Sequence, residues 1–246
     1  MASSLHLSMS SQSNGSQKAF YCVSLGPGAP ELITLASYNI LKEVDLIYCP
    51  TTARRSRSHD ILKALGIDLN KVILFQVTMS KDRSIVEQEY ATVTKEIEKK
   101  LNAEYSVALV AEGDAGFYSS ARYITEQLDL DGIPVHFAPG VPAFIAAGAC
   151  ASLHIVKQEE SLTVLTSGVT TERIRELLAM KSTVVIMKPS QHQDEVSRML
   201  QELHDATFHY FENVSLDEEY YTTDKALIAQ RNIPYFAILL IQNSER

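Results

Sequence analysis

One apolar run, followed directly by a glycine-rich turn, limits the possible folds of this chain more than any other segment. Residues 107–111 read VALVA, which is typical of a strand buried on both faces. Residues 112–116 read EGDAG, and glycine permits backbone turns that other residues resist. A helical pattern follows, with Ile124 and Leu128 four residues apart. The segment therefore predicts a strand, a turn and a helix, in that order.

The same arrangement occurs at two other places. The apolar run 20–25 ends at Gly-Pro-Gly, residues 26–28, and the run 134–138 ends at Pro-Gly-Val-Pro, residues 139–142, before a helix of small residues. Such alternation of strands and helices is typical of a parallel, doubly wound α/β sheet. In such a sheet the loops at the carboxyl ends of the strands lie side by side, where ligands bind. We therefore expect the three glycine loops to form one pocket.

The remaining pattern continues this alternation. In the first part of the chain we expect strands at 45–49 and 72–77 and helices at 31–42, 58–65 and 82–104, with Ser58 as the N-cap of the second helix. Further along we expect strands at 161–166, 183–187, 208–214 and 234–241 and helices at 170–180 and 195–203. The polar segment 217–230 is expected to be irregular and partly helical.

Composition excludes several classes of protein. The 246 residues carry a net charge of −8, whereas a dedicated nucleic-acid binder normally presents a basic domain or stripe. No apolar run approaches the roughly 18 residues of a membrane span. Residues 1–18 are rich in serine without a continuous apolar core, so we interpret them as a disordered tail and not a signal peptide. A transit peptide is the alternative, weakened by the absence of arginine.

The three cysteines, Cys22, Cys49 and Cys150, are far apart among apolar residues. This favours buried free thiols in a reducing compartment, and we expect a cytoplasmic protein.

Three sequence motifs carry a family resemblance. The segments VSLGPGAPELITLAS, AEGDAGFYSS and APGVPAFIAAGA together resemble the tetrapyrrole (corrin/porphyrin) methyltransferases of the cobalamin pathway, which use S-adenosylmethionine. Four weaker features look most like the branch that methylates precorrin-2 or cobalt-factor II at the C(20) meso carbon: FYSS, TMSKD, VVIMK and PYFAILLI. The resemblance extends from residue 20 to residue 241.

The resemblance implies a tetrapyrrole-methylase-like α/β fold of two α/β/α domains with the cofactor in the cleft between them. We expect an N-terminal domain at 19–138 with a parallel sheet and a C-terminal domain at 139–246 with a mixed sheet. It also implies a C-methyltransferase that acts on a small-molecule tetrapyrrole and forms a homodimer. The alternatives are another enzyme of this fold (another corrin ring position, diphthine synthesis or ribosomal RNA methylation) or a non-catalytic tetrapyrrole- or nucleotide-binding module. The acidic charge disfavours RNA.

Carried over by motif, the residues expected to bind the cofactor are Gly26, Pro27, Gly28, Glu112, Gly113, Asp114, Phe117, Pro142, Ala143 and Met187. Two positions depart from the family pattern, because Ala115 replaces a proline and Pro142 replaces a threonine. Residues 26–28 alone would suit an ordinary strand-to-helix turn, and they are not a dinucleotide loop because residue 31 is glutamate. The Asp114 carboxylate is able either to accept a hydrogen bond from the cofactor or to cap the next helix.

Arg54, Arg55 and Arg57 form a basic loop directly after the second predicted strand. Either it is a solvated surface loop, or it binds the eight carboxylates of an early corrinoid precursor, since arginine binds carboxylates in bidentate fashion. Lys188 and, more weakly, Lys81 are candidates for the same role.

Methyl transfer also requires a group that removes a proton from the methylated carbon, and Tyr118, Glu112 and water all remain candidates. The histidines lack metal-ligand spacing, so we expect no protein-bound metal, and we assign no chemistry to His136. The sequence leaves metal-free and cobalt-containing substrates equally open.

Overall fold

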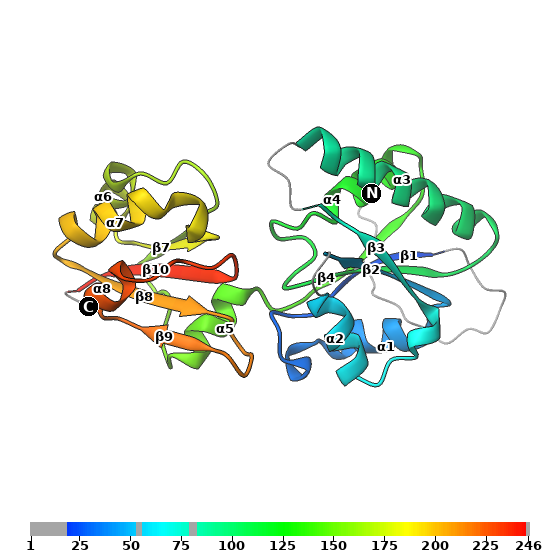
Figure 1. Ribbon diagram of the computed structural model, residues 1–246, viewed down its shortest axis with the longest axis horizontal. Coiled ribbons are helices and arrows are strands. Elements are labelled where there is room, and N and C mark those ends of the chain that lie inside the picture. Colours follow the sequence, from blue (N-terminus) through cyan, green and yellow to red (C-terminus); the bar gives the residue numbers. More distant parts are fainter. Residues whose placement is uncertain (1–18, 53–55, 79–82, 245–246) are drawn as a thin grey trace.

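The computed structural model describes residues 19–52, 56–78 and 83–244, which form two five-stranded sheets lying side by side (Figure 1). We call residues 19–138 the first half and residues 139–244 the second half. The first sheet has the order β3-β2-β4-β1-β5, and every neighbouring pair is parallel. Its strands are β1 (Phe20–Ser24), β2 (Leu46–Thr51), β3 (Val72–Gln76), β4 (Val107–Ala111) and β5 (Val135–Ala138). This confirms the predicted α/β class; the predicted tail, 1–18, lies outside the described residues.

Helices cover both faces of the first sheet (Figure 1). The central strand β4 is buried throughout, as its uninterrupted apolar sequence predicts. Its residues alternate between two cores: Val107 and Leu109 pack on one face, and Ala108 and Val110 on the other. The helices are α1 (Leu35–Glu43) and α2 (Arg57–Ala64) on one face and α3 (Arg83–Asn102) and α4 (Arg122–Leu130) on the other.

The second sheet is mixed, with the order β6-β7-β10-β8-β9. The pair β6 and β7 is parallel and the other pairs are antiparallel. Its strands are β6 (Ser161–Leu165), β7 (Ser182–Met187), β8 (Ala206–Glu212), β9 (Tyr220–Thr222) and β10 (Ala237–Asn243). Helices α6 (Thr171–Ala179), α7 (Gln193–Glu202) and α8 (Lys225–Ala229) contribute to one core, and α5 (Ala143–Cys150) to the core on the other face. The proposed domain boundary at 138/139 stays a prediction.

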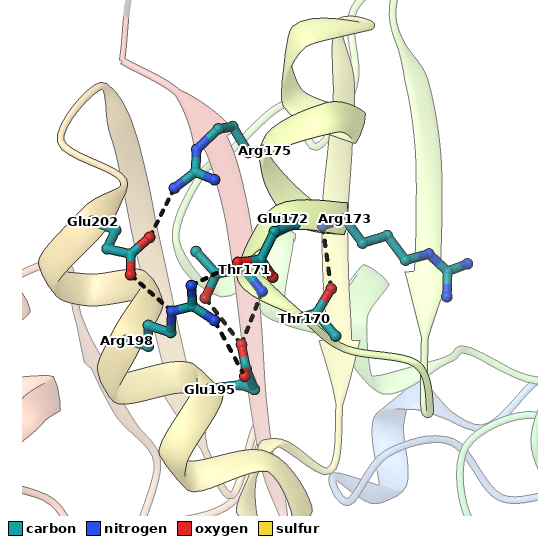
Figure 2. A network of polar contacts seen from close by, with 8 residues as sticks. All are labelled: Thr170, Thr171, Glu172, Arg173, Arg175, Glu195, Arg198 and Glu202. Atoms are coloured by element: carbon teal, nitrogen blue, oxygen red, sulfur yellow. Dashed lines mark hydrogen bonds and ion pairs between the residues drawn. The ribbon is translucent and has the colours of Figure 1, made fainter.

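A polar network joins α6 to α7 (Figure 2). The backbone nitrogen and the hydroxyl of Thr171 both donate to Oε2 of Glu195, at 2.9 and 3.0 Å. These bonds lower the pKa of Glu195 and satisfy a backbone donor at the start of α6. Arg198 of α7 donates to Glu172 of α6 at 2.6 Å and to Glu202 of its own helix at 2.7 Å. The hydroxyl of Thr170, the N-cap residue of α6, accepts from the nitrogen of Arg173, so Thr170 and Glu195 together satisfy backbone donors at the helix start.

Several expected details were wrong. Ser56, and not Ser58, is the N-cap of α2, since its hydroxyl accepts a 3.1 Å hydrogen bond from the backbone nitrogen of His59. Ser58 is buried and faces Glu112 instead. Strand β9 occupies part of the segment expected to be irregular, because it pairs with the edge of β8. Cys22 and Cys49 are buried free thiols as predicted, whereas Cys150 is exposed.

No helix in the described part of the chain has both the length and the apolarity needed to cross a membrane.

Candidate active site

The first and second glycine loops lie side by side at the carboxyl edge of the first sheet, as predicted. Gly26 and Gly113 exchange two backbone hydrogen bonds: the nitrogen of Gly26 donates to the oxygen of Gly113 at 3.1 Å, and the reverse bond is 2.7 Å long. Both residues have a positive φ, of 77° and 69°, which favours glycine at these positions. The two loops therefore form one backbone unit.

The third glycine loop is joined to the second through Asp114. Its Oδ2 accepts a 2.8 Å hydrogen bond from the backbone nitrogen of Gly140, and its Oδ1 accepts one of 2.9 Å from the nitrogen of Gly116. A Cβ atom at Gly140 would lie 2.4 Å from Cβ of Ser24 and 2.5 Å from the oxygen of Gly113, so no side chain fits there. Asp114 thus holds two loops together; it caps no helix, and its remaining lone pairs stay able to accept from a ligand.

Ser24 is a site residue that our sequence reasoning missed. It is fully buried at the end of β1. Its hydroxyl donates to the oxygen of Ala138 at 2.7 Å and accepts from the nitrogen of Ala115 at 2.8 Å. It therefore links β1, the second glycine loop and β5 below the site. The available signal was a polar residue inside an apolar run, just before a glycine turn.

Cofactor residues predicted from separate motifs meet in one apolar cluster. Phe117, Ala143 and Met187 all pack against the core that includes Phe144 of α5, and the Phe117 and Phe144 rings lie 5.6 Å apart. Ala143 begins α5, Pro142 precedes it as the N-cap residue, and Met187 ends β7. The second glycine loop, through Phe117, thus shares an apolar surface with the second half of the molecule.

The second loop also borders open space. A Cβ atom at Gly113 would meet no atom within 4 Å, so a ligand is able to approach this backbone closely. Residues Pro27 and Gly28 continue the first loop beside it. Asp114, the residue after Gly113, keeps carboxylate lone pairs that suit a ligand with hydroxyl or ammonium groups.

Glu112 lies at the end of β4, half-buried, next to the start of α2. Burial raises its pKa, and the positive charge of Arg57 and a 3.5 Å hydrogen bond from Ser58 act in the opposite direction. A raised carboxyl pKa at a ligand edge is consistent with proton transfer, so Glu112 stays a candidate base.

Tyr118 and Lys188 line one open pocket of about 940 Å3 together with Arg122, Tyr123 and Phe137. Tyr118 has a φ of 50°, is 53% exposed and donates its hydroxyl to the oxygen of Val164 at 3.2 Å. Lys188 also has a positive φ, of 55°, and its ammonium lies 5.4 Å from the centre of the Tyr235 ring. The structure therefore places a candidate base and a candidate carboxylate-binding cation in one cavity.

The basic loop is only partly described. Arg54, Arg55 and Lys81 lie outside the described residues. Arg57 contacts the second half of the molecule: it donates to Oδ1 of Asn213 at 2.6 Å, and its guanidinium lies 3.5 Å from the centre of the Phe236 ring.

Among the residues with described positions, no group of three or more His, Cys, Asp or Glu side chains is placed to hold a metal ion. The expected absence of a protein-bound metal stays a prediction. His136 lies in β5, with its ring 5.5 Å from that of Tyr21 in β1.

Residues 19–227 match the model of the tetrapyrrole (corrin/porphyrin) methylases, and the chain belongs to this family. It is 26% identical over 182 residues to a probable cobalt-precorrin-2 C(20)-methyltransferase of Methanocaldococcus jannaschii, covering 73% of this chain and 76% of that one.

Two solved structures share the fold. A cobalt precorrin-4 methyltransferase, CbiF, is similar with a TM-score of 0.73 and 18% identity over 93% of this chain and 96% of that one. The uroporphyrin-III C-methyltransferase of Thermus thermophilus in complex with S-adenosylhomocysteine has a TM-score of 0.62 and 20% identity, over 93% and 99% of the two chains.

Proposed function

We propose that this protein transfers a methyl group from S-adenosylmethionine to a ring-bridging carbon of a tetrapyrrole in cobalamin biosynthesis, with precorrin-2 or cobalt-factor II as the acceptor and C(20) as the methylated position. The observation that carries the proposal is the union of three family motifs into one site, through the Gly26–Gly113 and Asp114–Gly140 hydrogen bonds. Family membership supports the reaction class, and the similarity to the archaeal C(20) relative supports the position.

The residues proposed to bind S-adenosylmethionine fit its chemistry. The cofactor supplies an activated methyl group. The backbone at Gly113 borders open space, the Asp114 carboxylate suits hydroxyl or ammonium donors, and Phe117 and Met187 offer apolar surface. The first loop, residues 26–28, lies beside Gly113 through the two Gly26–Gly113 hydrogen bonds. The complex of the Thermus relative with S-adenosylhomocysteine supports the same cofactor class here.

The chain's contribution to the reaction is mainly positioning. Holding two reactants in the correct geometry supplies effective molarities of order 10⁵ M or more. Lys188, Arg54 and Arg55 are proposed to bind acceptor carboxylates. The proton that leaves the methylated carbon would pass to Tyr118, Glu112 or a water molecule. We further propose a cytoplasmic homodimer with domains at 19–138 and 139–246.

Mass spectrometry of the small molecules retained through purification, followed by turnover assays, tests this function. We expect S-adenosylmethionine or S-adenosylhomocysteine to copurify, and one added methyl group on metal-free precorrin-2 or on cobalt-factor II. Running both acceptors decides between them. A protein that binds a tetrapyrrole without consuming S-adenosylmethionine would favour the non-catalytic binding module.

A further inference from the structure

Side-chain hydrogen bonds join the two halves of the molecule beside the glycine loops. The nitrogen of Ala29, in the first loop, donates to the hydroxyl of Ser215 at 3.1 Å. The same turn of the second half packs tightly against this loop, because a Cβ atom at Gly28 would lie 2.9 Å from Leu216. Arg57 donates to Asn213 of this turn at 2.6 Å. The turn at residues 213–216 is therefore the part of the second half that contacts the first glycine loop.

The guanidinium of Arg57 makes two kinds of contact with the second half. It donates to Oδ1 of Asn213, and it lies over the Phe236 ring at 3.5 Å from the ring centre. A planar guanidinium suits both contacts at once, whereas the compact ammonium of lysine suits them poorly. Asn213 and Phe236 are themselves connected, since the nitrogen of Asn213 donates to the oxygen of Phe236 at 3.0 Å.

The turn that receives Arg57 is held in place. Asn213 has a φ of 48°, in the left-handed region that asparagine tolerates better than most residues. Directly before it, Glu212 is buried and accepts from Tyr210 at 2.6 Å and from Nη2 of Arg231 at 2.9 Å. Arg57 therefore contacts a turn that follows a hydrogen-bonded, buried residue, and its contacts link the two halves at this point.

The same arginine acts on Glu112 in the second glycine loop. Its positive charge lowers the pKa of Glu112, against the effect of burial. In the described part of the chain, Ser58 of α2 also donates to Glu112, at 3.5 Å, and the charge of Glu112 acts on the Cys49 thiol of β2. Burial raises the pKa of Cys49 to about 11, so that thiol stays neutral at physiological pH. Asp60 of α2 acts on Cys49 as a further charge in this region.

We propose that Arg57 is a positioning residue that holds the Asn213 turn against the glycine loops and, with the same guanidinium, places a positive charge beside Glu112. This assigns Arg57 a role between the halves in place of acceptor binding. Its effect on methyl transfer rests on the proposed function. Its effects on the contact between the halves and on Glu112 do not.

Three substitutions separate the contact with the Asn213 turn from the charge beside Glu112. Arg57→Lys keeps the charge and loses the planar group, and Arg57→Gln loses the charge. Asn213→Ala removes the acceptor and leaves the charge, but it also strains the backbone at a φ of 48°, so Arg57→Lys is the cleaner test of the contact. The matched control is Arg175→Lys, whose side chain forms an exposed ion pair on α6, in the network of Figure 2. Each protein is examined without ligand, by amide hydrogen exchange and by NMR of carboxyl-labelled glutamate.

We expect exchange of the Ala29 and Asn213 amides to accelerate about tenfold or more in Arg57→Lys and Asn213→Ala, and to stay at the parent rate in Arg175→Lys. The double variant, Arg57→Lys with Asn213→Ala, should exchange no faster than the faster of its two single variants, because both changes remove the same Arg57–Asn213 contact.

Arg57→Gln should raise the pKa of Glu112, and Asn213→Ala should leave it unchanged. Loss of kcat/KM of about tenfold is expected for Arg57→Lys, Arg57→Gln and Asn213→Ala, with the acidic limb of the pH profile shifted only in Arg57→Gln.

Parent-like exchange in both Arg57→Lys and Asn213→Ala would overturn the proposal, as would an unchanged Glu112 pKa in Arg57→Gln. If Arg57→Gln does not fold, the other two variants still decide the contact between the halves. If the parent transfers no methyl group, the proposed function fails, and the exchange and NMR results still test the role of Arg57.

Discussion

The backbone nitrogen of Gly140 donates a 2.8 Å hydrogen bond to the carboxylate of Asp114, which ties the third glycine loop to the second. This contact depends on glycine, because a Cβ atom at residue 140 would lie within 2.5 Å of both Ser24 and the Gly113 oxygen. A sequence requirement at one loop therefore sets the geometry of the two loops proposed to contact the cofactor.

Gly140→Ala should accordingly destabilise the protein by about 1–3 kcal/mol, as overpacking typically does, and should weaken S-adenosylhomocysteine binding. Urea unfolding and calorimetry measure the two effects. The control is Gly132→Asn, because Gly132 has a φ of 76° and open space around it, and asparagine tolerates such a φ. Parent-like binding by Gly140→Ala would contradict the proposed role of this close approach.

Gly113→Trp tests whether the open space beside the second loop is the cofactor site. The indole would enter space that no protein atom occupies within 4 Å of the Cβ position, so we expect S-adenosylhomocysteine binding to be lost while the protein still folds. The positive φ of 69° adds strain of about 1–2 kcal/mol.

The matched control is Gly66→Trp, which carries the same strain, with a φ of 68° and open surroundings. Gly66 follows the C-terminal end of α2, and Arg57 begins that helix. Circular dichroism should show both variants folded, and calorimetry should show binding only in Gly66→Trp. Equal binding by the two proteins would place the cofactor elsewhere.

Local sequence patterns predicted the parts of the fold that local forces determine. The strand at 107–111 was predicted with its observed ends, because an uninterrupted apolar run has little choice other than burial. Strand β9 was missed, since its existence depends on pairing with β8 and its own three residues carry no periodic signal. The N-cap of α2 was misassigned because Ser56 and Ser58 are both suitable caps, and only the geometry of the turn selects Ser56.

The site was predictable to the extent that single motifs describe it. The adjacency of the glycine loops follows from the parallel topology. The role of Asp114 in joining two loops does not, because its partner is 26 residues away. Arg57 shows the same limit: no spacing in the sequence predicts its contact with Asn213, which belongs to a distant turn. Long-range contacts of this kind leave no spacing pattern in the sequence.

Glu212 provides a pH-dependent contribution to stability. Burial alone would raise its pKa, but hydrogen bonds from Arg231 and Tyr210 outweigh burial and lower the pKa below the ordinary 4.5. A lowered pKa in the folded state gives stabilisation that is present above the unfolded-state pKa and lost as the pH falls through the folded-state pKa. Glu212→Gln should therefore cost about 2–3 kcal/mol at pH 7, somewhat less than a fully buried broken ion pair, since the Arg231 side chain is 35% exposed.

Urea unfolding of parent and variant at pH 7, 5, 4 and 3 measures this effect. The difference in unfolding free energy should be largest at pH 7 and should shrink below about pH 4.5, where the carboxylate of the unfolded chain takes up a proton, until the folded carboxylate is protonated at a lower pH. Exposed Glu218 serves as the control, and its change to Gln should alter stability by less than about 0.5 kcal/mol. A difference that does not vary with pH would show that packing, and not charge, accounts for the effect of Glu212.

Arg54 and Arg55 are the cations of the basic loop that remain assigned to acceptor binding, on the ground of their charge and their place in the sequence after β2. Replacing both by alanine should raise the KM for the tetrapyrrole tenfold or more and leave the affinity for S-adenosylhomocysteine unchanged. Breaking a desolvated, hydrogen-bonded charge pair at an interface costs about 2–5 kcal/mol, whereas breaking an exposed pair costs about 0–1 kcal/mol. A tenfold change in affinity corresponds to about 1.4 kcal/mol.

Added salt should weaken acceptor binding more in the parent than in the double variant, because screening acts on the charges that the variant lacks. Arg57→Lys is the informative comparison, since it should reduce kcat/KM without this change in salt dependence. If the double variant binds the tetrapyrrole normally and loses S-adenosylhomocysteine instead, Arg54 and Arg55 belong to the cofactor side of the site.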